Sequence, residues 1–297
     1  MKRREFLGGA AASGAVLTMP AFLSGCGIQG AAAVVDKTPE NPFMEWFGVD
    51  QATTARVMSE LSANGADAAD LYFQHSRTNY LTLEDGIVSS ASSDIQQGVG
   101  LRVVIGEQTG YAFTEDLTLP SMLAAARTAS AIASGNKVVA PQAFSALGAG
   151  SLYKTTVPWS DVGIDRKLPL MKFVEAQAKS MDEAVEKVAV YWADQDERVM
   201  IATLDGRLVT DHRPMTRVTV TVTARRGEEV QSGYSNIAAR EEFGWYTDER
   251  LTTMVREAVD RTMVLFDARR PPAGEMPVIL ASGASGILLH EAIGHGM

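Results

Sequence analysis

Residues 217–223, Arg-Val-Thr-Val-Thr-Val-Thr, are the stretch that decides the fold class of this 297-residue chain. Valines alternate with arginine and threonines through the whole stretch. A period of two is that of a β-strand, whose successive side chains point to opposite faces of a sheet. One face of this strand is therefore expected in the core and the other in water, which is typical of an antiparallel sheet.

More strand-like runs lie on both sides of this stretch. They are short, apolar or alternating, and cover residues 69–76, 80–84, 87–92, 99–105, 110–114, 188–193, 199–204 and 230–237. Turn residues separate them, at Asp85-Gly86, Gly98, Gly106 and Asp205-Gly206. This spacing is typical of antiparallel hairpins.

Helical patterns alternate with these groups of strands. They are expected over residues 51–63, 118–134, 165–184 and 247–265, and residues 136–160 are expected to form a loop. Asp50 and Thr247 stand where a helix cap is preferred. Together the patterns predict an α+β fold, in which helices pack on an antiparallel sheet.

The first residues of the chain predict an exported protein. Lys2, Arg3 and Arg4 precede an uncharged apolar stretch over residues 7–23, the pattern of a signal peptide with a twin-arginine head. Leu23-Ser24-Gly25-Cys26 resembles a bacterial lipobox, whose cysteine is acylated. We therefore expect a signal peptide over residues 1–25, a tether over 26–49, and a lipid anchor on Cys26 that holds the protein to the membrane on the periplasmic or extracytoplasmic side.

Composition excludes several classes of function. Cys26 is the only cysteine, so neither a disulfide within the chain nor a cysteine cluster for a structural metal can form. The net charge is -9, and the clustered cations that phosphate binding requires are missing from the sequence. We therefore expect no nucleic-acid partner.

The chemistry of the chain concentrates in residues 290–296, His-Glu-Ala-Ile-Gly-His-Gly, which hold two of the four histidines. A short buried strand is expected at 277–280, followed by a glycine-rich turn and a helix that begins near Gly286. The turn does not match the phosphate-binding glycine patterns. The nucleophile pattern of hydrolases requires glycines two residues on each side of the serine, and Ser285 is followed at that distance by Ile287. Two imidazoles beside a carboxylate indicate a metal-dependent hydrolase.

The histidine spacing requires an irregular helix. His290 and His295 are five residues apart, and five steps of about 100° separate them by roughly 140° on a regular α-helix. They can share one ion only if the helix contains a π-type turn or ends between them. Gly294 and Gly296 are the residues that permit either arrangement.

This motif resembles the HExxxH signature of the TldD/PmbA family of metalloproteases. Further segments resemble the family's N-terminal domain in order and spacing, namely residues 65–67, 83–86, 98–103 and 110–112. The resemblance implies an N-terminal α+β domain over residues 50–270 and the start of a metalloprotease C-terminal domain over 271–297.

The resemblance also implies a role for each motif residue. His290 and His295 would be ligands of a zinc ion, and Glu291 the catalytic carboxylate of a peptidase that acts on extended or unfolded peptides. Family members form dimers, so the expected partner is a PmbA-like subunit or a second copy of the chain. Family enzymes carry a C-terminal domain with a further ligand, usually a cysteine, after the motif. We therefore expect the 297 residues to be the front of a longer protein and inactive alone.

Other interpretations remain open at this stage. The chain could be a lipid-anchored peptide-binding or assembly subunit that performs no chemistry, or the motif could be a buried helix with incidental histidines. His75 and His212 receive no role. The acidic residues Asp194, Asp196 and Glu197 lack the pattern of a calcium loop and are expected in a solvated turn.

Overall fold

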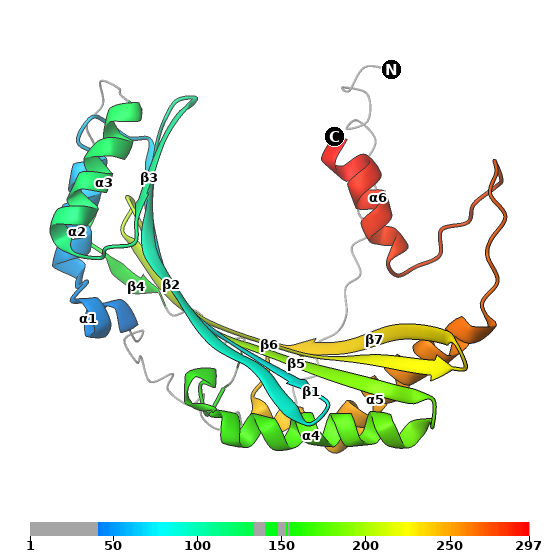
Figure 1. Cartoon of the computed structure of the whole chain (residues 1–297). Helices are drawn as coiled ribbons and strands as arrows, with labels where there is room; N and C mark the ends of the chain where they lie inside the picture. The colour runs from blue at the N-terminus through cyan, green and yellow to red at the C-terminus, as the bar shows by residue number, and fades with distance from the viewer. Residues whose placement is uncertain (1–40, 134–139, 148–152, 154, 297) are drawn as a thin grey trace, which may run out of the picture. The chain divides into compact units, whose positions relative to one another are not determined.

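The computed structural model describes residues 41–133, 140–147, 153 and 155–296. The predicted signal peptide, Cys26 and most of the predicted tether lie outside these residues. The described chain has a mixed α+β fold built on a curled, mainly antiparallel sheet with packed helices (Figure 1). The predicted fold class is therefore confirmed.

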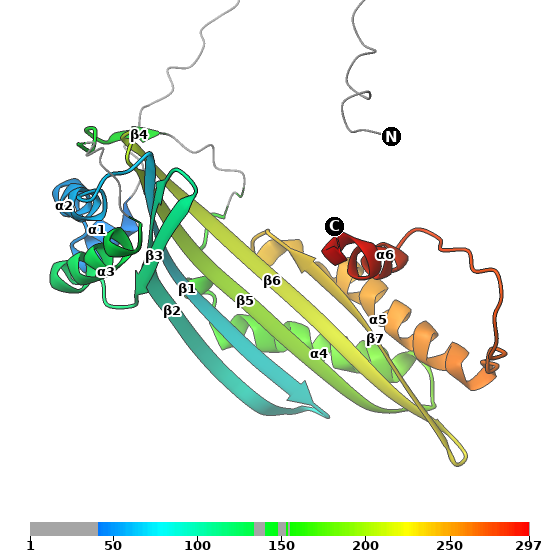
Figure 2. The same cartoon turned by 90° about the horizontal axis from the view of Figure 1, so that it is seen from above.

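Seven strands form one sheet (Figure 2). In chain order they are β1 (Ala68–Glu84), β2 (Ile87–Ile105), β3 (Gln108–Thr114), β4 (Ser145–Leu147), β5 (Val185–Thr203), β6 (Arg207–Arg226) and β7 (Glu229–Ala239). Their order in the sheet is β3-β2-β1-β5-β6-β4, and β7 also pairs with β6. Only the short β4 runs parallel to its neighbour.

The strands are longer than the sequence predicted. The separate runs 69–76 and 80–84 are one strand, because the polar residues 77–79 keep their pairing with both β2 and β5. Gly98, predicted as a separator, lies inside β2. Polar residues interrupt the hydrophobic alternation of a strand, but they leave its backbone hydrogen bonds intact. Apolar patterning alone therefore underestimated strand length.

The predicted turns are correct where the backbone needs a positive φ. Asp85 and Gly86 have φ of 45° and 81° between β1 and β2, and Gly106 has φ of 58° between β2 and β3. Gly206 has φ of 86° between β5 and β6. Asparagine, aspartate and especially glycine tolerate this region, so these turns can be identified from local sequence.

The helices agree with the predictions, with one addition. They are α1 (Pro42–Phe47), α2 (Gln51–Leu61), α3 (Leu119–Ile132), α4 (Ile164–Met181), α5 (Asp248–Met263) and α6 (Ser285–Ile293), with short 3₁₀ turns at Trp159–Asp161, Phe243–Trp245, Val264–Asp267 and Gly294–Gly296. Asp50 caps α2 by accepting a 2.7 Å hydrogen bond from the Thr53 amide. Helix α1 corrects the predicted tether, because Phe43 and Val49 are fully buried. The folded part of the chain therefore begins before residue 50.

Both groups of helices cover the same face of the sheet. The first group, α1 to α3, packs on a core that includes Phe73, Leu101 and Met122. The second group, α4 and α5, packs on a core that includes Trp192 and Val220. In β1 the buried apolar residues of both cores are odd-numbered, so they point to one side of the strand.

The alternation in residues 217–223 works as predicted. Val218, Val220 and Val222 are at most 1% exposed beneath α4 and α5, while the residues between them are not buried. The side chains of β6 thus separate a helix-covered face from an open face.

The segment that follows α5 does not form the predicted strand at 277–280. Val278 is 73% exposed and Ile279 is 94% exposed, and no described strand pairs with them. An apolar run of four residues needs a neighbouring strand to form a ladder, so the apolar character of this run was misleading. Among the described helices, none combines the length and the apolar character needed to span a bilayer.

Candidate metal centre

The motif residues converge at the end of α6. His290 and Glu291 belong to the last turns of the helix, and His295 lies in the 3₁₀ turn Gly294–Gly296 that follows it. The two imidazole centroids are 4.6 Å apart. The ligand atoms of His290, Glu291 and His295 all lie within 4.8 Å of one another, the only such group within the described residues.

The helix ends between the two histidines, which is one of the two arrangements that their spacing allowed. The α-helix stops at Ile293, and the chain continues as a 3₁₀ turn rather than a π-type turn. The change of helix type brings together two imidazoles that a regular helix would separate.

Gly294 is needed for space and not for an unusual backbone. Its φ of -61° and ψ of -38° are ordinary helical values. A Cβ atom at this position would lie 2.8 Å from Nδ1 of His290, closer than real Cβ atoms approach other atoms. At Gly296 a Cβ atom would have nothing within 4 Å. The two glycines therefore have different functions, which the sequence alone could not separate.

The donor set suits a borderline metal such as zinc. Two imidazole nitrogens are typical zinc ligands, and catalytic zinc sites usually take three protein ligands. Glu291 lies beside them, with Oε2 3.5 Å from Nε2 of His295. The side chains of His295 and Glu291 are 66% and 61% exposed. The group is therefore accessible to a metal ion, a further ligand and a substrate.

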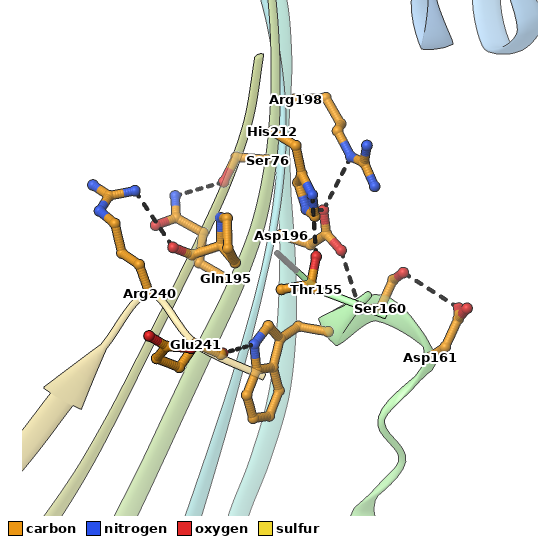
Figure 3. Close-up of polar contacts among 12 residues, drawn as sticks. Ser76, Thr155, Ser160, Asp161, Gln195, Asp196, Arg198, His212, Arg240 and Glu241 are labelled. Atoms are coloured by element: carbon orange, nitrogen blue, oxygen red, sulfur yellow. Dashed lines mark hydrogen bonds and ion pairs between the residues drawn. The ribbon is translucent and has the colours of Figure 1, made fainter. Parts of the chain in front are cut away.

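The other two histidines have structural surroundings. His75 packs against Trp46 of α1, with ring centroids 4.8 Å apart. His212 lies between the two helix groups, where its Nε2 is 2.9 Å from Oδ1 of Asp196 and its Nδ1 is 3.4 Å from Oγ1 of Thr155 (Figure 3). Neither histidine belongs to a possible metal group of the described chain.

Asp196 contacts residues of two strands and of the segment before α4. Its carboxylate also accepts hydrogen bonds from Nε of Arg198 and from the backbone amide of Ser160 (Figure 3). Burial raises the pKa of Asp196, but the hydrogen bonds and the positive charges of His212 and Arg198 outweigh it, so that the net pKa is lowered. The prediction of a solvated turn is wrong, because Asp196 is a buried residue within β5.

Asp194 corrects the same prediction more strongly. Its side chain is 1% exposed, and its Oδ2 lies 2.6 Å from Nζ of Lys167, which α4 inserts toward the sheet. Asn79 donates a 2.8 Å hydrogen bond to the other carboxylate oxygen. A buried carboxylate is tolerated only when it is paired in this way. Its partners are 27 and 115 residues away in the sequence, so local sequence gave no sign of the pairing.

Two models of a metallopeptidase family match this chain. Residues 69–133 match the PmbA/TldA metallopeptidase domain 1, and residues 157–266 match the central domain of the same family. The chain belongs to the PmbA/TldD metallopeptidase family. The region 50–270, treated as one domain in the sequence analysis, thus includes two family domains on one continuous sheet.

Individual relatives agree with this assignment. The chain is 34% identical over 253 residues to the metalloprotease TldD homologue of Haemophilus influenzae, covering 82% of this chain and 52% of the relative. The fold is similar to that of a protein from Bacteroides thetaiotaomicron assigned as a candidate modulator of DNA gyrase (TM-score 0.57, 16% identity, 71% and 49% coverage). It is also similar to TldE from Thermococcus kodakarensis (TM-score 0.52, 15% identity, 71% and 47% coverage). The chain spans about half the length of the curated relatives it matches.

Proposed function

We propose that this chain supplies the zinc-binding motif of a TldD-like peptidase that hydrolyses extended or unfolded peptides. The observation that carries the proposal is the convergence of His290, Glu291 and His295 within 4.8 Å in a member of a metallopeptidase family. On a regular α-helix, two histidines five residues apart would point in different directions. The convergence therefore depends on the irregular end of α6.

The proposed site divides the chemistry among three side chains. His290 and His295 would hold the zinc ion, which supplies Lewis acidity at the scissile carbonyl when it is bound. Glu291 would accept a proton from the attacking water and transfer it to the leaving amine. The Glu291 side chain is 61% exposed among the described residues, which supports this role. The third zinc ligand is proposed to be a cysteine from the family's C-terminal domain.

The partners and the location of the protein belong to the same proposal. We infer a dimer, formed with a PmbA-like subunit or with a second copy of the chain. Export by the twin-arginine route and acylation of Cys26 would hold the peptidase at the membrane, on the periplasmic or extracytoplasmic side.

A paired measurement on the gene product, purified without chelator, tests the proposal. Metal analysis should find stoichiometric zinc in the wild type and in Glu291→Gln, and should find it lost in His290→Ala. Hydrolysis of an unfolded protein substrate should disappear in both variants, because one lacks the proton acceptor and the other lacks the metal. Tight peptide binding without zinc, unchanged in Glu291→Gln, would instead support the non-catalytic binding subunit.

A further inference from the structure

The open face of the sheet contains a trough that the proposed chemistry does not use. It has a volume of about 810 Å³ and is lined by residues of β1, β2 and β3, among them Tyr72, Gln74, Gly98, Gly100, Tyr111 and Phe113. Around the trough, α1 to α3 pack on the opposite face of these strands. We call this feature the β2 trough.

Two glycines form the floor of the β2 trough. Gly100 pairs with Tyr72 on one side and with Phe113 on the other, and Gly98 pairs with Gln74. Because neither glycine has a side chain, β2 leaves a gap between the side chains of β1 and β3. The Tyr111 ring lies over Gly100, where a Cβ atom would come within 2.8 Å of its hydroxyl. The gap is therefore built into the sequence of β2.

Aromatic side chains on β3 form one wall of the trough. Phe113 is 69% exposed and Tyr111 is 55% exposed, although both lie on β3, whose other face is packed against α3. A phenylalanine ring exposed to this extent beside a concave surface is suited to an apolar or aromatic ligand group. No described side chain covers it.

The remaining lining is polar and includes one cation, Arg102, and two carboxylates, Asp70 and Glu115. Gln74, Gln96 and Gln97 contribute amides that can both donate and accept hydrogen bonds. The only cation in the lining, Arg102, is already paired with Asp70 at 2.7 Å. The trough therefore has no free positive charge for a phosphate, a nucleic acid or another anion.

The dimensions of the trough favour an extended ligand. Its lining follows β2 from Gln96 to Arg102, which at about 3.3 Å per residue is roughly 20 Å. A compact metabolite would occupy only part of this length, whereas an extended peptide of similar length fits along it. Side-chain amides can pair with peptide groups of any sequence, and the aromatic wall adds a preference for one side chain.

We propose that the β2 trough binds an extended peptide segment without acidic side chains and selects an aromatic side chain against Phe113 and Tyr111. This inference rests on the proposed peptidase function for the nature of the substrate, and it adds a docking site within domain 1 and a preference in sequence. Binding at the trough requires no metal, so it can be measured separately from hydrolysis.

The test measures binding of two fluorescent, unstructured peptides by anisotropy. The peptides differ only in a central phenylalanine or alanine, and the protein carries Glu291→Gln so that it cannot turn them over. We expect the phenylalanine peptide to bind about tenfold more tightly than the alanine peptide. Phe113→Ala should remove this difference. Tyr234→Ala, which removes a 58% exposed ring on β7, is the matched control and should leave the difference intact.

The possible outcomes separate the trough from the peptidase proposal. Equal binding of both peptides, or a preference that persists in Phe113→Ala, would overturn the trough as an aromatic subsite even if the zinc-loaded wild type hydrolyses peptides. A Phe113-dependent preference in a protein that binds no zinc would support the trough and contradict the peptidase.

Discussion

Two regions of this chain hold their polar groups by different means. In the helix-covered sheet, Lys167 and Asp194 are 4% and 1% exposed, and elements far apart in the sequence fix their positions. In the segment that follows α5, His295 and Glu291 are 66% and 61% exposed, and a single helix end brings them together. The positions of the buried Lys167 and Asp194 side chains depend on tertiary packing, whereas the positions of the motif side chains depend on local helix geometry.

This difference separates stability from chemistry. A change to the buried pair should reduce the free energy of unfolding, because a lost partner leaves a charge in a medium that solvates it poorly. A change to the motif should alter metal binding and should leave the unfolding of the metal-free protein unaffected, since bound metal itself adds stability. Each prediction below tests one side of this separation.

The largest effect is expected for Asp194→Ala. The substitution leaves the Lys167 ammonium buried without its carboxylate, and removing one partner of such a pair costs about 3–5 kcal/mol. Chemical denaturation should show this loss as a lower midpoint. His290→Ala is the matched change in the other region, and it should leave the midpoint of the metal-free protein unchanged.

A double variant separates the charge from the packing. In Lys167→Met with Asp194→Leu, no uncompensated charge remains, so most of the lost stability should return. If this double variant is as unstable as Asp194→Ala, the loss comes from packing and not from the buried charge.

The same division explains what the sequence predicted about the fold. The alternation in residues 217–223, the positive-φ turns and the Asp50 cap are local features, and the structure confirms each of them. Strand continuity through residues 77–79 and the absence of a strand at 277–280 depend on neighbouring strands, so a single segment does not encode them.

The candidate site divides in a similar way. The motif at residues 290–296 could be identified from composition and spacing. The sequence allowed either a π-type turn or a helix that ends between the two histidines, and it could not decide between them. The pairing of His212 with Asp196 depends on the register of β5 and β6, in which Arg198 stands opposite His212. If the register of β5 and β6 had been known, it would have predicted the contact between His212 and Asp196. Without the register, neither residue could be given a role.

An intermediate effect is expected for Gly294→Val, which tests the local geometry of the motif. The new side chain would meet Nδ1 of His290 and displace the imidazole. Misplaced ligand orientation typically weakens metal affinity by about 10–100-fold. Zinc titration by calorimetry measures the change, and the denaturation midpoint of the metal-free protein should stay constant.

Gly296→Val is the control for this prediction. It adds the same side chain two residues away, where a Cβ atom meets nothing within 4 Å. Its zinc affinity should equal that of the wild type. Equal weakening in both variants would show that chain flexibility, and not the approach to His290, explains the glycines.

The smallest effect concerns the pH dependence of the sheet region. The pKa of Asp196 is lowered below its ordinary value of 3.8 in the folded protein, because the bonds to His212 and Arg198 outweigh burial. A lowered folded-state pKa contributes stability that is present above pH 3.8 and is lost as the pH falls through the folded-state pKa. The difference in unfolding free energy between wild type and Asp196→Asn should therefore shrink as the pH falls below about 4. His212→Ala removes a main cause of the lowered pKa of Asp196. In proteins that carry His212→Ala, the difference in unfolding free energy caused by Asp196→Asn should therefore depend less on pH in the acid range. A difference that does not change with pH would mean that Asp196 stabilises the loop as a hydrogen-bond acceptor and not through its charge.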